Sequence, residues 1–205
     1  MRSNRWLASF CTSGSAAHRR LFVLAVVVAY AHSMAIASEV PVSQMKGTVV
    51  HVDDGDTVDL LDANHDQHRV RLASIDAPEL SHERQEAGRV GQPFADRARV
   101  YLSQLVMGRV VEATCPDVDR YGRLVCDLGI DGASANRAMV RAGLAWANMA
   151  AGGRYMRDPA MLQLQADARA ARAGLWSDAN PTAPWEWRRL CWEEGQCDID
   201  NGNRR

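Results

Sequence analysis

Two acidic turns divide the first part of the globular region into three runs with the character of β-strands. Each run is rich in β-branched residues or alternates apolar with polar residues, which is typical of half-buried strands. Gly, Asp and Asn between such runs favour tight turns, and runs joined by short turns pair antiparallel. The runs are 46–53 (KGTVVHVD), 56–61 (DTVDLL) and 68–75 (HRVRLASI), and the turns are 54–55 and 62–67.

The rest of the chain mixes helical and strand patterns. Apolar spacing, together with proline at starts and glycine at ends, predicts three helices. Two more strands surround a turn at 116–121, and a polar loop spans 79–92. The sequence therefore predicts an α+β domain in which one compact barrel is capped by helices. The predicted helices are 93–107, 134–142 and 159–173, and the two later strands are 109–115 and 122–128.

The N-terminal segment has the layout of a secretory signal peptide. Arg19 and Arg20 precede the apolar run 21–31, and Ala35 and Ala37 form an A-x-A pattern. The alternative is an uncleaved membrane anchor, but the apolar core of about 11 residues is short of the ~20 that a span needs. We expect cleavage after residue 37, export to the periplasm or the extracellular medium, and no membrane association afterwards.

Charge excludes one class of nucleic-acid binder. The chain has 24 basic and 25 acidic residues; removing the four arginines of residues 1–37 leaves 20 basic residues and a net charge of −5. A nonspecific polyanion binder would present the opposite balance. Any binding to nucleic acid must therefore depend on local arginines.

Four cysteines remain after Cys11 leaves with the signal peptide, and an even number in an exported chain favours two disulfides. Three connectivities are possible. We favour the two that flank short turn-rich segments, and metal binding is less favoured because no C-x2-C spacing occurs. The predicted pairs are Cys115–Cys126 and Cys191–Cys197. The second pair lies in a tail, residues 177–205, that we expect to wrap the domain in an extended form.

The stretch 52–59 (VDDGDTVD) holds four carboxylates in eight residues, so it is either a solvated turn or surrounds something positive. Other motifs follow it in order, and together they resemble the staphylococcal nuclease family over roughly residues 45–176. The resemblance implies a five-stranded OB-fold barrel with three helices, and we assign it residues 38–176 as one domain. The matching motifs are D54-G-D-T57, R71-L-x-x-I-D-A-P-E79, D119-R-Y-G-R123, N136-R-A-M-V-R-A-G-L-A145 and A168-R-A-A-R-A-G-L-W176.

The resemblance also implies roles for individual residues. Asp56 and Asp76, at adjacent strand ends, converge on one Ca²⁺ together with the backbone carbonyl of Ala77, where the family usually has threonine. Glu79 is the general base for the attacking water. Arg71 and Arg123 grip the phosphate, for which a planar guanidinium is well suited. The substrate-side residues are Tyr121, Arg120 and Tyr155.

The motifs leave the other acids of the turn and the base-stacking residues to be assigned. We expect Asp54 either to fix the turn or to support the metal ligands from behind, and Asp53 and Asp59 to be solvated. After Ala145 the family has base-stacking tyrosines that this chain lacks, so Tyr155 or Trp146 would replace them.

A calcium-loop reading of 62–73 fails because Gln67 and Ala73 stand where glycine and glutamate are required, and His65 and His68 fit a solvated turn better than a transition-metal site.

The implied function is an exported, Ca²⁺-dependent endonuclease that cleaves DNA and RNA with low sequence specificity and leaves 3′-phosphate ends. We expect it to be a monomer with no stable protein partner. The alternative is a catalytically silent nucleic-acid-binding module of the same fold. A pure binder has no physical need for the complete set of acids and arginines, which favours the enzyme. That set is Asp56, Arg71, Asp76, Glu79 and Arg123.

Overall fold

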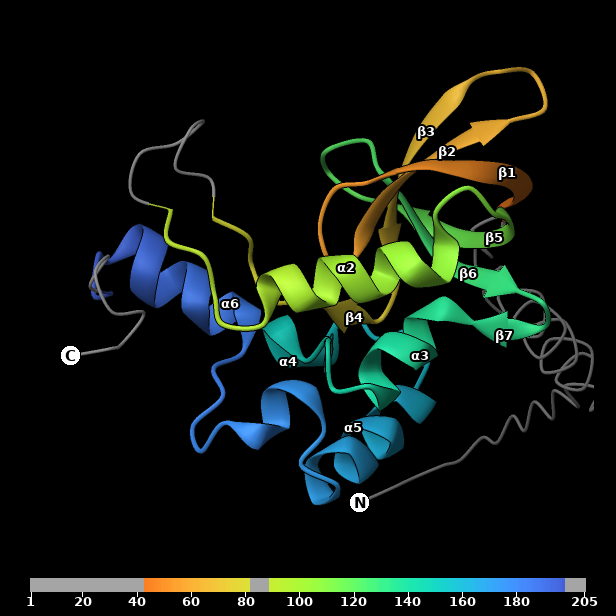
Figure 1. The fold of residues 1–205 in the computed structure, drawn as a ribbon. Helices are drawn as coiled ribbons and strands as arrows, with labels where there is room; N and C mark the ends of the chain where they lie inside the picture. Colours follow the sequence, from red (N-terminus) through yellow and green to blue (C-terminus); the bar gives the residue numbers. More distant parts are fainter. Residues whose placement is uncertain (1–42, 82–88, 198–205) are drawn as a thin grey trace, which may run out of the picture. The chain divides into compact units, whose positions relative to one another are not determined.

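The computed structural model describes residues 43–81 and 89–197 (Figure 1). The predicted signal peptide and the last residues of the tail lie outside this part of the chain. Five strands form a closed barrel in the order β3-β2-β1-β5-β6, and a parallel pairing of β3 with β6 closes it. The first three strands are antiparallel neighbours, as predicted. The strands are β1 (Ser43–Val52), β2 (Thr57–Asp62), β3 (Gln67–Leu72), β5 (Val110–Val118) and β6 (Leu124–Ile130).

The alternation of β3 shows how the sequence builds the barrel. Val70 and Leu72 are fully or almost fully buried and point into the core, whereas Arg69 and Arg71 lie on the other face. Because strand side chains alternate between faces, one arginine-bearing face is available at the barrel surface. The short strands β4 (Ile75–Asp76) and β8 (Trp146–Ala147) pair with each other, and β7 (Ala133–Ser134) pairs antiparallel with the end of β6.

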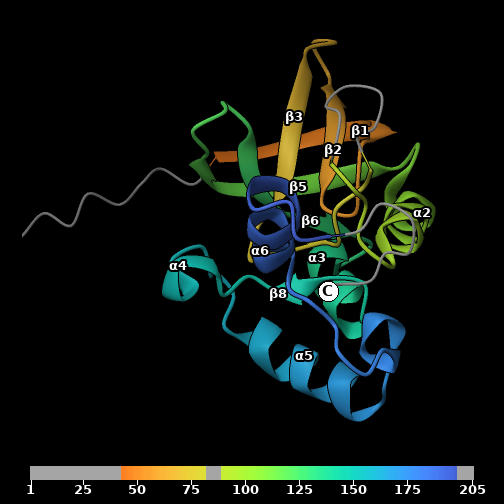
Figure 2. The same ribbon diagram turned by 90° about the vertical axis from the view of Figure 1, so that its left-hand side faces the viewer.

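Three main helices accompany the barrel at the predicted places, which confirms the α+β class (Figure 2). Ser134 caps one of them by accepting a hydrogen bond from the Arg137 amide, the usual role of serine before a helix. Two four-residue helices were not predicted. The main helices are α2 (Ala95–Val106), α3 (Ala135–Arg141) and α5 (Ala160–Ala170), and the short ones are α4 (Ala150–Gly153) and α6 (Pro184–Trp187).

The tail is helical where we expected an extended wrap. A 3₁₀ turn (Gly174–Ser177) follows α5, and α6 continues directly into a π-helical stretch (Arg188–Glu193). Pro184 is suited to the first turn, since its missing N–H would have no partner there. Trp187 and Cys191, four residues apart, share one helical face and are both buried. Burial of this apolar face, rather than the polar residues around it, favours the helical conformation of the tail.

Both predicted cysteine pairs are brought together in the structure. Cys115 and Cys126 join the neighbouring strands β5 and β6. Cys191, within the π-helical stretch, is joined to Cys197 just beyond its end. Within residues 43–81 and 89–197, no helix is both long and apolar enough to cross a membrane.

Candidate active site

Two of the predicted metal ligands meet on one guanidinium at an end of the barrel. Thr57, the first residue of β2, pairs with Arg71 of β3, so the preceding Asp56 lies beside the arginine. Arg71 Nη1 contacts Asp56 Oδ1, and Arg71 Nη2 donates to Asp76 Oδ1 at 2.7 Å. Both carboxylates are almost completely buried. The two acids therefore meet on Arg71, and their predicted convergence on one Ca²⁺ stays a prediction.

Gly55 explains why the acidic turn takes this form. A Cβ atom at this position would lie 2.6 Å from the Cβ of Ala77 and 2.8 Å from that of Ala98 in α2. The missing side chain lets the turn press against both neighbours. As a result Asp56 Oδ2 accepts a hydrogen bond from the Ala77 amide at 2.7 Å. The turn thus links the side chain of Asp56 to the backbone of Ala77, and both residues are predicted metal ligands.

Asp54 fixes the turn, as predicted, because its Oδ1 accepts the Asp56 amide at 2.8 Å. Burial raises the pKa of Asp54, against the lowering effect of the nearby charges of Arg71 and Arg123. The prediction for Asp59 is wrong: this side chain is buried rather than solvated. Asp59 lies opposite Arg69 in the β2–β3 register, and the Arg69 guanidinium compensates its charge.

Asp53 is the more open of the two acids that we expected to be solvated. Its side chain is 39% exposed and shares the same Arg69 guanidinium. Two arginines of β3 therefore compensate the acids of this turn. Arg69 pairs with Asp53 and Asp59, and Arg71 pairs with Asp56.

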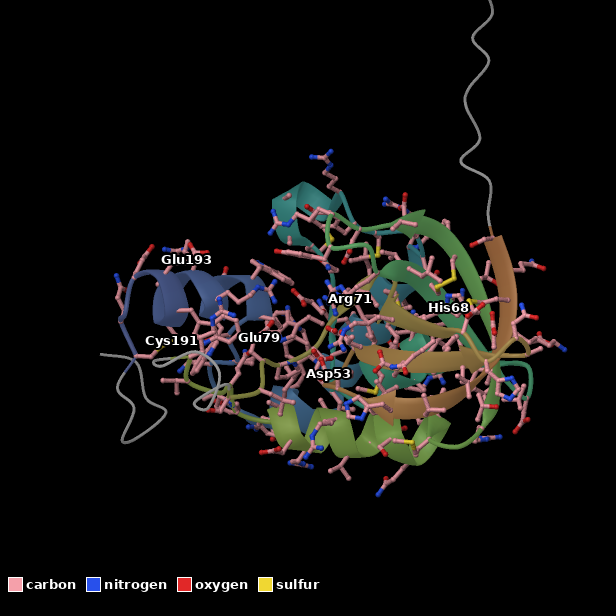
Figure 3. The ribbon with its side chains drawn as sticks, turned by 90° about the horizontal axis from the view of Figure 1, so that it is seen from above. Asp53, His68, Arg71, Glu79, Cys191 and Glu193 are labelled. Carbon is pink, nitrogen blue, oxygen red and sulfur yellow. A yellow bond between two sulfur atoms is a disulfide. The ribbon has the colours of Figure 1, made fainter. Side chains whose placement is uncertain are left out.

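Glu79 is held by a residue that the sequence did not indicate. Arg188, from the C-terminal segment, contacts Glu79 Oε1 through Nη1 and donates from Nη2 to Asp76 Oδ2 at 2.8 Å. Figure 3 shows Glu79 between the C-terminal helical segment and the barrel, with Arg71 on the barrel side. No motif links the tail run PWEWRR to the acidic cluster, so Arg188 could not be found by pattern.

The surroundings of Glu79 change its acidity. Burial raises the pKa of this carboxyl to about 7, and the charge of Asp76 acts in the same direction. The guanidinium of Arg188 works against this shift. A carboxyl with a pKa near neutrality can take up or release a proton under physiological conditions, which suits a general base.

Arg123 lies on the turn between β5 and β6. Its Nε donates to Asp119 Oδ2 at 2.7 Å, and Asp119 also accepts the Arg123 amide at 3.0 Å. These bonds lower the pKa of Asp119, although its partial burial alone would raise it. Arg120 and Arg123 both face the ring of Tyr121, which is 68% exposed. The turn therefore presents two guanidinium groups and one aromatic ring together at the surface.

The two residues considered as base-stacking replacements differ in exposure. Trp146 is buried against Trp176 and Trp185, with ring centroids 4.4 and 5.9 Å away, so it is a core residue and cannot stack on a nucleotide. Tyr155, between α4 and α5, is half exposed. Its predicted contact with substrate stays a prediction.

The donor set suits a hard cation. Asp56, Asp76, Glu79 and the Ala77 carbonyl offer oxygen atoms alone, which is the chemistry that Ca²⁺ prefers. Asp56 Oδ2 and Asp76 Oδ2 each accept one hydrogen bond, so each keeps acceptor capacity. Among the described residues no three His, Cys, Asp or Glu side chains gather closely enough to hold a metal alone. A site here would need the carbonyl and water as further ligands.

A closed mixed barrel with paired carboxylates and arginines at one end has the features of an enzyme that hydrolyses phosphodiesters. Comparison with known proteins gives the same class. The model of the family described as staphylococcal nuclease homologue matches residues 69–178. A micrococcal nuclease of Shigella flexneri is 39% identical over 179 residues, covering 81% of this chain and 94% of the relative.

Two further relatives are similar over most of this chain. An uncharacterized endonuclease of Escherichia coli is 40% identical over 147 residues, covering 71% of this chain and 86% of the relative. The E. coli protein ParB is 39% identical over 156 residues, covering 72% and 81%. The chain belongs to the staphylococcal nuclease family, and is a nuclease.

Proposed function

We propose that this nuclease is an exported, Ca²⁺-dependent endonuclease that cleaves DNA and RNA with low sequence specificity. One observation supports the chemistry most strongly: Asp56, Arg71, Asp76, Arg188 and Glu79 form one continuous cluster of charges. Export rests on the signal-like N-terminus, and calcium on the oxygen-only donor set. Weak oxygen sites for this ion function best outside the cytosol.

Glu79 removes a proton from the attacking water. The water oxygen forms a bond to phosphorus as the bond from phosphorus to the 5′ oxygen breaks. The 5′ oxygen takes a proton from solvent and leaves as a hydroxyl, and the phosphate stays on the 3′ end. Because the pKa of Glu79 lies near 7, part of the population is ionised and ready to act at neutral pH.

Arg71 and Arg123 neutralise the phosphate. Their guanidinium groups stay charged and donate in a planar fork, so they stabilise the extra negative charge that develops at phosphorus. Arg71 also keeps the carboxylates of Asp56 and Asp76 side by side. These acids, with the Ala77 carbonyl, would hold Ca²⁺, which when bound adds Lewis-acid stabilisation of the phosphate charge.

Low specificity follows from what the site can contact. Contacts to phosphates fix the position of a nucleic acid without reading its sequence. The exposed groups nearest to this role, Arg120, Tyr121 and Arg123, offer charge and one stacking surface. Such groups suit both DNA and RNA.

The test is cleavage of supercoiled plasmid and single-stranded RNA by the exported form, with Ca²⁺, with Mg²⁺ and with chelator. Glu79→Ala and Arg123→Ala should each lower the rate by about 10²-fold or more, as expected for a general base and a charge-stabilising donor. Glu112→Ala and Arg99→Ala, at exposed positions, are the controls. Retention of single strands on a gel without cleavage under any metal would favour the silent binding module.

A further inference from the structure

The C-terminal segment 182–192 is hydrogen-bonded to residues that follow Glu79 in the chain. Trp187 Nε1 and Trp192 Nε1 both donate to the carbonyl of Val90 at 3.0 Å. The carbonyl of Thr182 accepts from Gln92 Nε2 at 2.5 Å. Trp187 is almost fully buried, so this contact excludes solvent. Three hydrogen bonds thus fasten the tail to residues about a hundred positions earlier in the chain.

Gln92 passes this constraint on to Glu79. The Gln92 amide donates to the Glu79 carbonyl at 2.7 Å, and Gln92 Oε1 accepts the Glu79 amide at 3.2 Å. Both backbone polar groups of Glu79 are therefore bonded to one residue. Gln92 is itself buried and holds Thr182. The tail consequently fixes the backbone of Glu79 through Gln92.

Arg188 fixes the side chain of Glu79. One guanidinium contacts the Glu79 carboxylate and also donates to both oxygens of Asp76, at 2.8 and 3.3 Å. A rigid planar group shared by two carboxylates sets their separation and orientation. It also compensates the like charges of the buried Asp76 and the partly buried Glu79, which would otherwise repel each other.

We propose that Arg188 is a positioning residue of the nuclease reaction, presented to the active site by the docking contacts of Thr182, Trp187 and Trp192. The proposal rests on the role proposed for Glu79 above. Arg188 acts through Glu79 and Asp76: it keeps the base carboxylate in the orientation from which it takes the proton of the attacking water. The family model ends at residue 178, so this contribution comes from beyond the matched region.

The test compares Arg188→Ala and Arg188→Lys with Arg189→Ala in the exported chain at saturating Ca²⁺. Arg189 is the matched control, because it is exposed and pairs with Glu194 alone among the contacts described for it. We expect Arg188→Ala to lower kcat by about 10- to 100-fold, the usual effect of losing a partner that orients a functional group. KM for plasmid should stay unchanged, and Arg189→Ala should match the wild type.

Two further measurements separate positioning from general structural support. Guanidinium chloride, below the concentrations that unfold the protein, should restore part of the kcat of Arg188→Ala and none of that of Glu79→Ala. Without metal, hydrogen exchange at the Gln92 amide should be as slow in Arg188→Ala as in the wild type, because the bonds from the tail to Val90 and Gln92 remain. Faster exchange in Arg188→Ala would mean that the tail has detached, and would overturn the positioning role in favour of structural support. Lysine can reach one carboxylate but not bridge two, so Arg188→Lys should recover part of the kcat; it decides the question if Arg188→Ala does not fold.

Each contrary result has a defined meaning. A wild type that cleaves nothing under any metal defeats the proposed nuclease chemistry. A fully active wild type with an equally active Arg188→Ala defeats the positioning role alone. Tighter Ca²⁺ binding by calorimetry, with faster cleavage in Arg188→Ala, would show that Arg188 competes with the metal and would overturn the proposal.

Discussion

The two halves of the candidate active site are built in different ways. Asp56, Arg71 and Asp76 lie within one stretch of 21 residues. The β2–β3 register places Asp56 beside Arg71, and Asp76 belongs to β4, which follows β3 directly and pairs with β8. Glu79 lies where no strand or helix fixes it. Its partner Arg188 is 109 residues away in the sequence. The first half follows from strand pairing, whereas the second depends on a tail docked onto the domain.

This difference indicates where each half is vulnerable. A change in the strand half should affect folding as well as catalysis, because its charges are buried within the barrel. A change in the tail half should affect catalysis more than global stability, because the tail contributes none of the five barrel strands. The following predictions test this contrast.

Arg71→Ala should have the largest effect on stability. It leaves the buried carboxylates of Asp56 and Asp76 without their shared guanidinium, and breaking a buried ion pair from one side costs about 3–5 kcal/mol. Urea unfolding with chelator measures the loss. Arg109→Ala, which breaks an exposed pair with Asp131, should cost less than about 1 kcal/mol. If the two variants are equally stable, the stability of the barrel does not depend on Arg71, contrary to this prediction.

The pH dependence of unfolding probes the tail half. Glu79 has a folded pKa of about 7, raised by burial from its ordinary value of 4.5. Between these values the folded state keeps a proton that the unfolded state has released, so the contribution of Glu79 to stability falls as pH rises through this window. The stability of the wild type relative to Glu79→Gln should therefore decline by up to about 3 kcal/mol from pH 4.5 to 7 and then stay level.

The measurement is urea unfolding of metal-free protein across this pH range, with Glu112→Gln as the exposed control. Because Arg188 lowers the pKa of Glu79, the decline should extend to higher pH in Arg188→Ala. A relative stability that rises with pH would mean that the ion pair with Arg188, and not burial, dominates the acidity of Glu79.

Sequence patterns predicted the strand half well. Alternation in β3 separates Arg71 from Val70 and Leu72, and turn chemistry locates Asp54 and Gly55. These are local signals with a known period. The burial of Asp59 was missed, since the arginine opposite an acid depends on strand register, which a single strand does not reveal.

The tail half could not be predicted because its signals are not local. The contact of Arg188 with Glu79 requires knowing where α6 docks, and this depends on burial of Trp187 beside Val90. The same reason explains Trp146, which looked like a stacking residue but packs against two other tryptophans. Long-range packing, not composition, decides these positions.

The two disulfides allow the same comparison, because one lies in the barrel and the other in the tail. Cys115–Cys126 joins two barrel strands, and replacing both residues with alanine should lower the free energy of unfolding by about 3 kcal/mol, as a constraint on a short loop would. Catalysis per folded molecule should stay the same. Cys191–Cys197 closes a loop beyond Arg188, which keeps its own contacts with Asp76 and Glu79. Its double alanine variant should therefore lower kcat by less than about tenfold.

Urea unfolding and plasmid cleavage of the two double variants measure both effects side by side. The barrel pair should change stability and the tail pair should change catalysis slightly, each with little effect on the other quantity. If the tail variant instead loses as much activity as Arg188→Ala, the disulfide loop itself must hold Arg188 against Glu79. The tail would then act as one closed unit, and the ion pairs of Arg188 would be a consequence of its docking rather than the cause.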